Sequence, residues 1–369
     1  MTPFTSTIAE SEVQPLQRPQ PLVRADAMAQ VTFERRDTQR MHRFLEDFGL
    51  LGGEVDSQTH HYRGYGETPC LVEVSSSPRD RFVGFAMTAP DRTSLERLST
   101  STGNPIKPHQ GPGGGEKVTL IDPDGLQIEF IYGAAKAEPL PTRDETIPIN
   151  TPFAKSRINS GVRTALAPSP VFRLGHVVLQ TPNFDRALDW YTTHFGFIVS
   201  DAAVLPDGRA NLAFCRLDRG EQAADHHSLA ILGGPAAGLL HVSFETFDLE
   251  SVGQGHQYLR SRGWAHHWGI GRHVLGSQIF DYWKDPAGDE WEHYADGDLL
   301  DASQPTYYHR LDRAGLWAWG DDLPDSLRPK FSLRQFISML RAARAGKLDM
   351  ARMDGLRRSM SIPPRGWMR

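Results

Sequence analysis

A nine-residue segment occurs twice in this chain, as DPDGLQIEF at 122–130 and as DPAGDEWEH at 285–293. Each copy passes from an Asp-Pro turn through a glycine into a short strand. Each copy also places a glutamate seven residues after its first aspartate, Glu129 in one and Glu292 in the other. Because such a repeat indicates a duplicated structural unit, the regions around the two copies can be compared position by position.

The regions that precede the repeated segment align as well. Residues 29–50 match 175–197, each an apolar strand, a polar turn and an amphipathic helix that ends in Phe-Gly. Residues 82–98 match 239–259, again a strand, an aspartate and a helix. Each half therefore reads as two strand–helix–strand–strand–strand units of roughly 55 residues, which need a partner to bury one sheet face. We predict an α+β fold of two domains, each made of paired units.

The boundaries of this organisation follow from composition. The predicted segments are a flexible N-terminal arm over 1–24, an N-terminal domain over 25–135, an irregular linker over 136–170, a C-terminal domain that holds the active site over 171–300 and an extension over 301–369. Within the extension, a helix is expected near 332–345, with Ser332 as its N-cap and Gly346 as its stop. We interpret the basic end of the chain as a solvated face rather than a binding patch.

Composition excludes several classes of protein. The chain has 369 residues, a net charge of −5 and only two cysteines, which argues against a nucleic-acid partner and against a disulfide framework. Neither a signal peptide nor an apolar stretch of the roughly 18 residues needed to cross a bilayer is visible. We therefore expect a cytoplasmic protein without a membrane partner.

The aligned halves differ where chemistry would be expected. The second half has His176 where the first has Gln30, and His241 where the first has Gly84. Only the glutamate, Glu292 in the second half, occurs in both. A single strand histidine is more often a core residue than a ligand, but three such residues at equivalent positions of one half favour a metal site. We expect the strands of two paired units to bring these side chains together in the C-terminal domain.

Two imidazoles and one carboxylate leave about three coordination positions open, which suits Fe(II) enzymes that bind a substrate together with oxygen. Zinc hydrolases that use the same residue types usually carry a helical H-E-x-x-H motif, which this sequence lacks. The ligand types alone leave Mn(II) open as an alternative metal.

The segment GRHVLGSQIFDYWKDPAGDEWE at 271–292 resembles the signature of the type I extradiol ring-cleaving dioxygenases of the vicinal oxygen chelate superfamily. The signature has a histidine, a tyrosine before an Asp-Pro-x-Gly turn, and then a glutamate ligand. The resemblance covers 171–300 directly and 25–135 by architecture, with the active site in the barrel of the C-terminal domain. One departure is Asp281, where the family usually has an apolar residue, and we consider a shift of strand register there.

The resemblance implies specific roles. The implied iron ligands are His176, His241 and Glu292. His227 matches the acid–base histidine, whereas His273 and Tyr282 match groups that hydrogen-bond substrate oxygens. The implied reaction is the cleavage of a catechol by O2, with Fe(II) as cofactor, beside rather than between the two hydroxyls. Family members are commonly oligomers, so a homo-oligomer is expected.

Two other functions stay open at this point. One is a related metal enzyme of the same superfamily, a glyoxalase-like isomerase or a thiol transferase, and the other is a ligand-sequestering protein on the same fold. His266 and His267 are interpreted as loop residues, and His256 and His293 as structural. The segment LWAWGDDL in the extension either closes over a ring substituent or packs against the domain, and the ring substituent itself cannot be read from the sequence.

Overall fold

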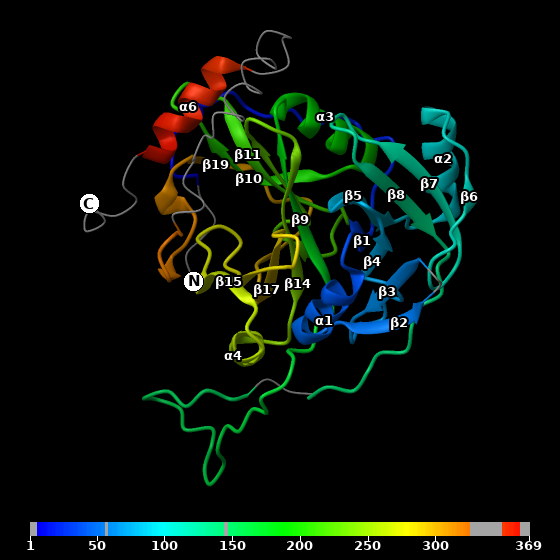
Figure 1. The fold of residues 1–369 in the computed structure, drawn as a ribbon. Coiled ribbons are helices and arrows are strands. Elements are labelled where there is room, and N and C mark those ends of the chain that lie inside the picture. The colour runs from blue at the N-terminus through cyan, green and yellow to red at the C-terminus, as the bar shows by residue number, and fades with distance from the viewer. Residues whose placement is uncertain (1–5, 56–57, 144–146, 325–348, 362–369) are drawn as a thin grey trace.

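The computed structural model describes residues 6–55, 58–143, 147–324 and 349–361. These residues form two large mixed sheets with helices packed on them (Figure 1). In spatial order, the first sheet consists of β2 (Leu51–Val55), β3 (Thr59–Arg63), β4 (Val72–Ser76), β1 (Ala27–Arg35), β5 (Arg81–Thr88), β8 (Gln127–Tyr132), β7 (Glu116–Ile121) and β6 (Lys107–Pro108).

The second sheet extends from the C-terminal half into the chain beyond residue 300. In spatial order, it consists of β19 (Tyr307–Arg310), β10 (Ile198–Val204), β11 (Ala210–Arg216), β13 (Leu229–Gly233), β9 (Arg173–Thr181), β14 (Gly238–Glu245), β17 (Glu290–Ala295), β16 (Ile279–Lys284), β15 (Ala265–Arg272) and β20 (Trp319–Gly320). Two short strands, β12 (Ala224–Asp225) and β18 (Leu299–Leu300), pair separately.

The strand order confirms the predicted α+β fold of paired units. In each unit the first strand pairs in parallel with the last, as β1 with β4 and β14 with β17. The first strands of two successive units pair antiparallel, as β1 with β5 and β9 with β14. The helices that follow the first strands are α1 (Thr38–Phe48), α2 (Arg92–Thr102), α3 (Phe184–Phe195) and α4 (Leu249–Ser261). The domain boundaries given above stay predictions.

The helix ends follow from local side-chain chemistry. All four helices begin after a side chain that accepts a hydrogen bond from a backbone N–H of the first turn, and these N-caps are Asp37, Asp91, Asn183 and Asp248. The predicted Phe-Gly endings are confirmed, because Gly49 and Gly196 follow the last helical residue with φ of 106° and 74°. These backbone angles favour glycine, which has no Cβ.

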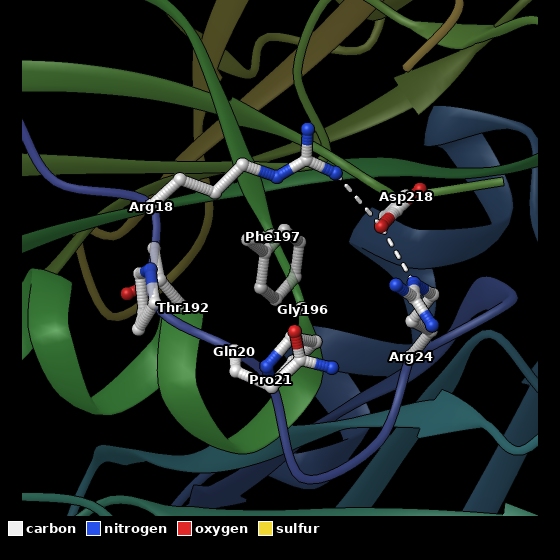
Figure 2. Close-up of a pocket in the computed structure, with 9 residues that line it drawn as sticks. Arg18, Gln20, Pro21, Arg24, Thr192, Gly196, Phe197 and Asp218 are labelled. Carbon is white, nitrogen blue, oxygen red and sulfur yellow. Dashed lines mark hydrogen bonds and ion pairs between the residues drawn. The ribbon is translucent and has the colours of Figure 1, made fainter. Parts of the chain in front are cut away.

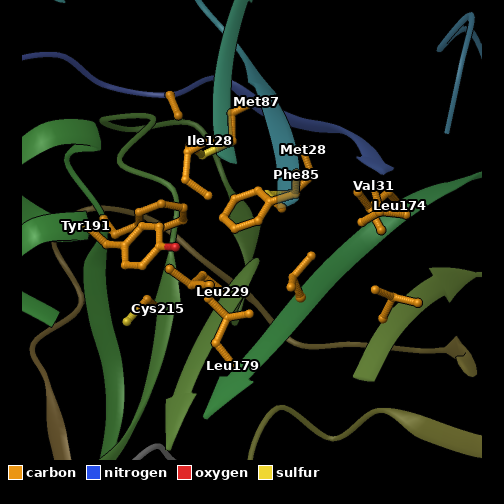
Figure 3. Close-up of a cluster of buried hydrophobic side chains, with 14 of the residues drawn as sticks. Met28, Val31, Phe85, Met87, Ile128, Leu174, Leu179, Tyr191, Cys215 and Leu229 are labelled. Carbon is orange, nitrogen blue, oxygen red and sulfur yellow. The ribbon is translucent and has the colours of Figure 1, made fainter. Parts of the chain in front are cut away.

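The core joins the two sheets. Phe85 and Ile128 of the first sheet pack with Leu179 and Leu229 of the second in one cluster of fully buried side chains (Figure 3). Because β1 also contacts β9, the middle strands of the two sheets face each other. Burial of apolar surface between the sheets is what holds the two halves together.

The repeated Asp-Pro-x-Gly segments form the same turn. In each copy the first aspartate accepts hydrogen bonds from the backbone N–H groups two and four residues later, at 2.9 and 2.8 Å for Asp122 and at 2.8 and 3.0 Å for Asp285. The glycines Gly125 and Gly288 both have φ of 95°, a conformation that residues with a Cβ rarely adopt. The two turns therefore share the same hydrogen bonds and the same glycine conformation.

The second carboxylate oxygen of each turn reaches the other half of the molecule. Asp122 Oδ2 accepts a hydrogen bond of 2.8 Å from the hydroxyl of Tyr191 on α3. Asp285 Oδ2 lies 2.7 Å from Nη2 of Arg35, at the end of β1, and this ion pair is fully buried. Each copy of the turn thus contacts the sheet or helix of the opposite half.

The N-terminal residues lie along the C-terminal half. The backbone N–H of Leu16 donates to the hydroxyl of Tyr308, and both Arg18 and Arg24 pair with Asp218 (Figure 2). The small pocket beside these arginines contains none of the predicted site residues. The flexibility expected of this arm stays a prediction.

The chain beyond residue 300 packs on the same sheet. Trp317, within the segment LWAWGDDL, is fully buried and contacts Trp268 of β15 edge to face, with ring centroids 5.9 Å apart. This segment therefore packs against the domain. The helix expected near 332–345 lies outside the described residues. A helix that the sequence analysis did not identify, α6 (Met350–Ser361), is anchored by Arg352, which pairs with Asp185 at 2.8 Å.

Candidate metal centre and active site

Three adjacent strands bring the predicted metal ligands together. Ser243 of β14 lies directly opposite His176 of β9 on one side and Glu292 of β17 on the other. Residues that are opposite one another in a sheet point to the same face, and so do residues two apart on one strand. His241 therefore shares this face with His176 and Glu292. Ser243 lies between the latter two on the same face, and its side chain is small.

The distances between the three side chains suit one metal ion. His176 Nε2 lies 3.0 Å from Glu292 Oε2 and 3.3 Å from His241 Nε2, while His241 Nε2 lies 3.5 Å from Glu292 Oε2. Ligand atoms held about 2.1 Å from one ion stand about 3.0–3.4 Å from each other. The same three residues form one of two groups of His, Cys, Asp or Glu side chains in the described chain that could hold a metal.

The surroundings of the Glu292 carboxylate suit a cation. Glu292 is fully buried, and the nearest imidazole nitrogens lie 3.0 Å (His176 Nε2) and 3.5 Å (His241 Nε2) from its Oε2. An uncompensated buried charge is strongly destabilising. Burial raises the pKa of a carboxyl, but the neighbouring His176 holds the pKa of Glu292 well below its usual range. An ionised, buried carboxylate between two imidazoles fits a divalent ion.

The protonation state of His241 also suits a ligand. Burial lowers its pKa to about 4, against a smaller opposing effect of Glu292. His241 is therefore neutral near pH 7 and offers a lone pair, as metal binding requires. Its side chain is 16% exposed, whereas those of His176 and Glu292 are fully buried, so the group can be reached from solvent on the His241 side.

The second group of possible metal ligands has a different character. Asp281 accepts hydrogen bonds from His256, His266 and the Trp283 indole at 3.1, 2.9 and 2.6 Å. Both oxygens of this buried carboxylate are thus occupied by N–H donors. We interpret the group as a hydrogen-bonded cluster that satisfies both oxygens of Asp281.

Asp281 also bears on two sequence-based expectations. A register shift was considered there. The pairing of β16 with β17 is uninterrupted from Ile279 to Lys284, with Tyr282 opposite Glu292, whereas the pairing of β15 with β16 shifts between Gly269, opposite Asp281, and Gly271. His266 and His267 were expected in a loop, whereas both belong to β15. The helix α4 brings His256 over β15 and β16. Asp281, the residue that departs from the family pattern, therefore has its partners on the face of the sheet that α4 covers.

His227 lies beside the three-residue group. Its ring centroid is 4.2 Å from that of His176. The side chain is buried, and the residue belongs to the segment that connects β12 to β13. Burial, together with the neighbouring His176, lowers the pKa of His227 well below its usual range. A neutral imidazole in this position can accept a proton. His227 Nδ1 lies 3.1 Å from Nδ1 of the preceding residue, His226.

His273 and Tyr282 form a hydrogen-bonded pair on the opposite side of Glu292. His273 Nδ1 lies 2.6 Å from the carbonyl oxygen of Leu316, and its Nε2 lies 2.9 Å from the hydroxyl of Tyr282. Because a carbonyl only accepts, Nδ1 carries the proton and Nε2 accepts from the tyrosine. Burial and the Glu292 charge raise the pKa of Tyr282 well above its usual value, so the phenol stays protonated. All six residues singled out from the sequence thus lie in one region.

The sequence analysis missed several residues that act on this region. It did not single out His226, which is fully buried and lies 2.5 Å from Asp201 of β10. It also did not connect Leu316 with His273. The only signal for His226 was the unusual pair DHH before an apolar strand, and nothing in the sequence indicates which element supplies its partner.

Solved structures share this fold. A Mn(II)-bound glyoxalase from Novosphingobium aromaticivorans superposes with a TM-score of 0.68 at 23% identity, covering 84% of this chain and 96% of that one. The substrate complex of homoprotocatechuate 2,3-dioxygenase from Brevibacterium fuscum also gives 0.68, at 19% identity, over 84% and 94% of the two chains. Residues 173–293 match the model of the Glyoxalase/Bleomycin resistance protein/Dioxygenase superfamily.

Sequence relatives identify the family more closely. Metapyrocatechase 2 from Cupriavidus necator is 30% identical over 294 residues, which are 77% of this chain and 85% of the relative. Biphenyl-2,3-diol 1,2-dioxygenase from Metapseudomonas furukawaii is 26% identical over 269 residues, or 72% and 76% of the two chains. The chain belongs to the extradiol dioxygenases of the vicinal oxygen chelate superfamily. The predictions of ring cleavage, an iron cofactor, and a catechol and O2 as reactants are confirmed for this family.

The described residues contain no helix that is both long and apolar enough to span a bilayer.

Proposed function

We propose that His176, His241 and Glu292 hold the Fe(II) of an extradiol catechol dioxygenase, and that His227, His273 and Tyr282 handle its protons. The observation that carries this proposal is the fully buried Glu292 carboxylate, with the nitrogens of two imidazoles 3.0 and 3.5 Å from its Oε2 and 3.3 Å from each other. The chemistry that Fe(II) supplies when bound is Lewis acidity toward a catechol hydroxyl and electrons for the activation of O2.

The arrangement of ligands supports two reactants at one ion. Three protein side chains on one face leave about three positions open, enough for the two catechol oxygens and one further molecule. Holding the reactants side by side supplies much of the rate enhancement. His241, the most exposed of the three ligands, marks the side from which these molecules enter.

His227 is the proposed acid–base residue. It is neutral because burial lowers its pKa, and its ring stacks obliquely against that of His176 at 4.2 Å. From this position it takes a proton from the substrate side and returns it during ring opening. A positioned histidine of this kind contributes roughly 10²–10⁴-fold to the rate.

Tyr282 and His273 are proposed to orient the catechol. The Tyr282 proton is directed to His273 Nε2 at 2.9 Å, and this leaves the lone pairs of the phenol oxygen free to accept a hydrogen bond from a catechol hydroxyl. His273 is in turn fixed by the Leu316 carbonyl, so the chain beyond residue 300 sets the direction of this pair.

A cytoplasmic location and a homo-oligomer also stay part of the proposal.

Reconstitution tests the proposal. The purified protein is loaded with Fe(II) without oxygen, mixed with a panel of substituted catechols, and exposed to air while oxygen uptake and a yellow ring-opened product are followed. His241→Ala is expected to lose both iron and ring cleavage. Gln30→Ala and Glu129→Gln, at the equivalent positions of the first half, are matched controls that should keep both within about twofold of wild type.

Two results would count against the proposal. One is a His241→Ala protein with normal iron content and full ring cleavage. The other is colourless isomerisation of a thiol adduct in place of a yellow product, which would favour a glyoxalase-like enzyme instead.

A further inference from the structure

His227 stands at the end of a chain of hydrogen bonds that begins near the surface. His309 Nε2, on β19, lies 2.7 Å from Asp201 Oδ1, and the other oxygen of Asp201 lies 2.5 Å from His226 Nε2. His226 Nδ1 then lies 3.1 Å from His227 Nδ1. The four side chains come from β10, β19 and the segment between β12 and β13, and His226 is fully buried.

The chemistry of these contacts fixes where each proton resides. Burial raises the pKa of a carboxyl, but His226 and His309 lower the pKa of Asp201 to about 2. Asp201 is therefore an ionised acceptor, and the nitrogens that face it must be N–H donors. With a single ring proton, on the Nε2 that faces Asp201, His226 presents only a lone pair at Nδ1. His227 must then donate from its own Nδ1.

The second donor to Asp201 makes this arrangement stable. His309, whose side chain is 12% exposed, supplies an N–H to the carboxylate from the solvent side, and its Nδ1 lies 3.2 Å from the hydroxyl of Thr7. Each oxygen of Asp201 therefore has one histidine nitrogen beside it, so the carboxylate does not depend on His226 alone. A cationic His226 would instead donate to His227 and force the opposite tautomer on it.

We propose that Asp201 and His226 are positioning residues that hold His227 protonated on Nδ1, so that its Nε2 presents a lone pair to the substrate. This inference rests on the proposed acid–base role of His227. The logic is that of the aspartate in a Ser-His-Asp triad, which fixes the tautomer of its histidine and is not itself protonated. Here the carboxylate acts through an intervening imidazole.

Asn and Leu at position 226 provide the test, because their side chains have nearly the same shape. Asparagine keeps an oxygen that can accept from His227 Nδ1, whereas leucine removes the acceptor. We expect His226→Leu to lower kcat by about 10–100-fold, since part of the general-base contribution is lost, with unchanged iron content and unchanged KM for the catechol. His226→Asn is expected to retain kcat within about fivefold of wild type. A packing role alone would affect the two variants alike.

A double-mutant cycle with His227→Phe separates this inference from the proposed function. If His226 acts only through His227, adding His226→Leu to His227→Phe causes no further loss of kcat. Additive losses, or equal kcat in the Asn and Leu variants, would overturn the inference while leaving the role of His227 intact. Full activity of His227→Phe alone would instead overturn the proposed function.

Two measurements guard against a simple folding defect. His109, a buried histidine of the first half, gives a matched pair of controls, His109→Leu and His109→Asn, which should differ in stability but not in kcat. The tautomer of His227 can also be read without any substitution, from ¹⁵N-labelled histidine signals of the protein loaded with diamagnetic Zn(II). A proton on Nε2 of His227 in that spectrum would refute the proposal.

Discussion

The two copies of the repeated segment carry the same glutamate in two different environments. Glu129 lies opposite Thr119 and accepts hydrogen bonds from Lys117 and Gln127 at 2.6 and 2.8 Å. Glu292 occupies the equivalent position on β17, where its neighbours are the imidazoles of His176 and His241 at 3.0 and 3.5 Å. The carboxylate of the first half is paired with a lysine, whereas that of the second half is the proposed metal ligand.

Strand register shows how the second half avoids the lysine. Lys117 lies opposite Ile131, two positions beyond Glu129 on β8, and the corresponding residue opposite Tyr294 on β16 is Phe280. The register also confirms that Gln30 is the counterpart of His176 and Gly84 the counterpart of His241. The two halves therefore differ in two respects that bear on metal binding. The second half has the histidines, and it lacks a lysine beside the glutamate.

The largest expected effect comes from restoring the lysine. In Phe280→Lys, the ammonium can reach Glu292 as Lys117 reaches Glu129, because the two positions share the same register. Iron affinity should fall by more than the roughly 10–100-fold typical of changes around a ligand, since one ligand is itself paired. Iron content and oxygen uptake measure the effect. Phe280→Leu, which adds no charge, should keep its iron, and normal iron in Phe280→Lys would break the comparison.

A smaller effect is expected at the turn of the second half. Arg35→Leu removes the partner of the buried Asp285, and leaving a buried charge unpaired costs roughly 3–5 kcal/mol. Urea unfolding measures the difference. Arg36→Leu is the matched control, because its ion pair with Asp80 is exposed and should contribute no more than about 1 kcal/mol. Equal losses in both variants would contradict the importance of the buried pair.

The turn of the first half should be less sensitive. Tyr191→Phe removes only a neutral donor to Asp122, and a hydrogen bond to a charged group contributes about 1.5–3 kcal/mol. The same unfolding measurement applies, with iron content and kcat expected to be unchanged. A loss larger than that of Arg35→Leu would reverse the proposed ranking of the two turns.

The sequence was informative wherever one half could be read against the other. His176 and His241 stood out because Gln30 and Gly84 replace them, and the paired strand–helix–strand–strand–strand units followed from the alignment of the two halves. Gly84 also explains why a histidine could not simply return there, since a Cβ at this position would lie 1.8 Å from the carbonyl oxygen of Gln127.

Contacts between elements without a counterpart in the repeat could not be foreseen. Asp201 meets His226 and His309 because β10 pairs with β19, a strand from beyond the duplicated region. The partners of Asp281 come from α4, β15 and β16, because His256, His266 and Trp283 all reach it. In both cases the partner of a charged residue depends on tertiary packing, which neither periodicity nor spacing encodes.

The two Asp-Pro-x-Gly turns, each in contact with the opposite half, show what the first half contributes to the structure of the second. Asp285 lies seven residues before Glu292 and meets its countercharge on β1, so a chain that begins after the linker would lack Arg35 and expose the apolar face that packs on β9. The first copy therefore contributes packing and a countercharge to the second, although it has Gln30 and Gly84 in place of the two histidines. We therefore expect neither half to fold without the other, even though the proposed active site lies in the second half alone.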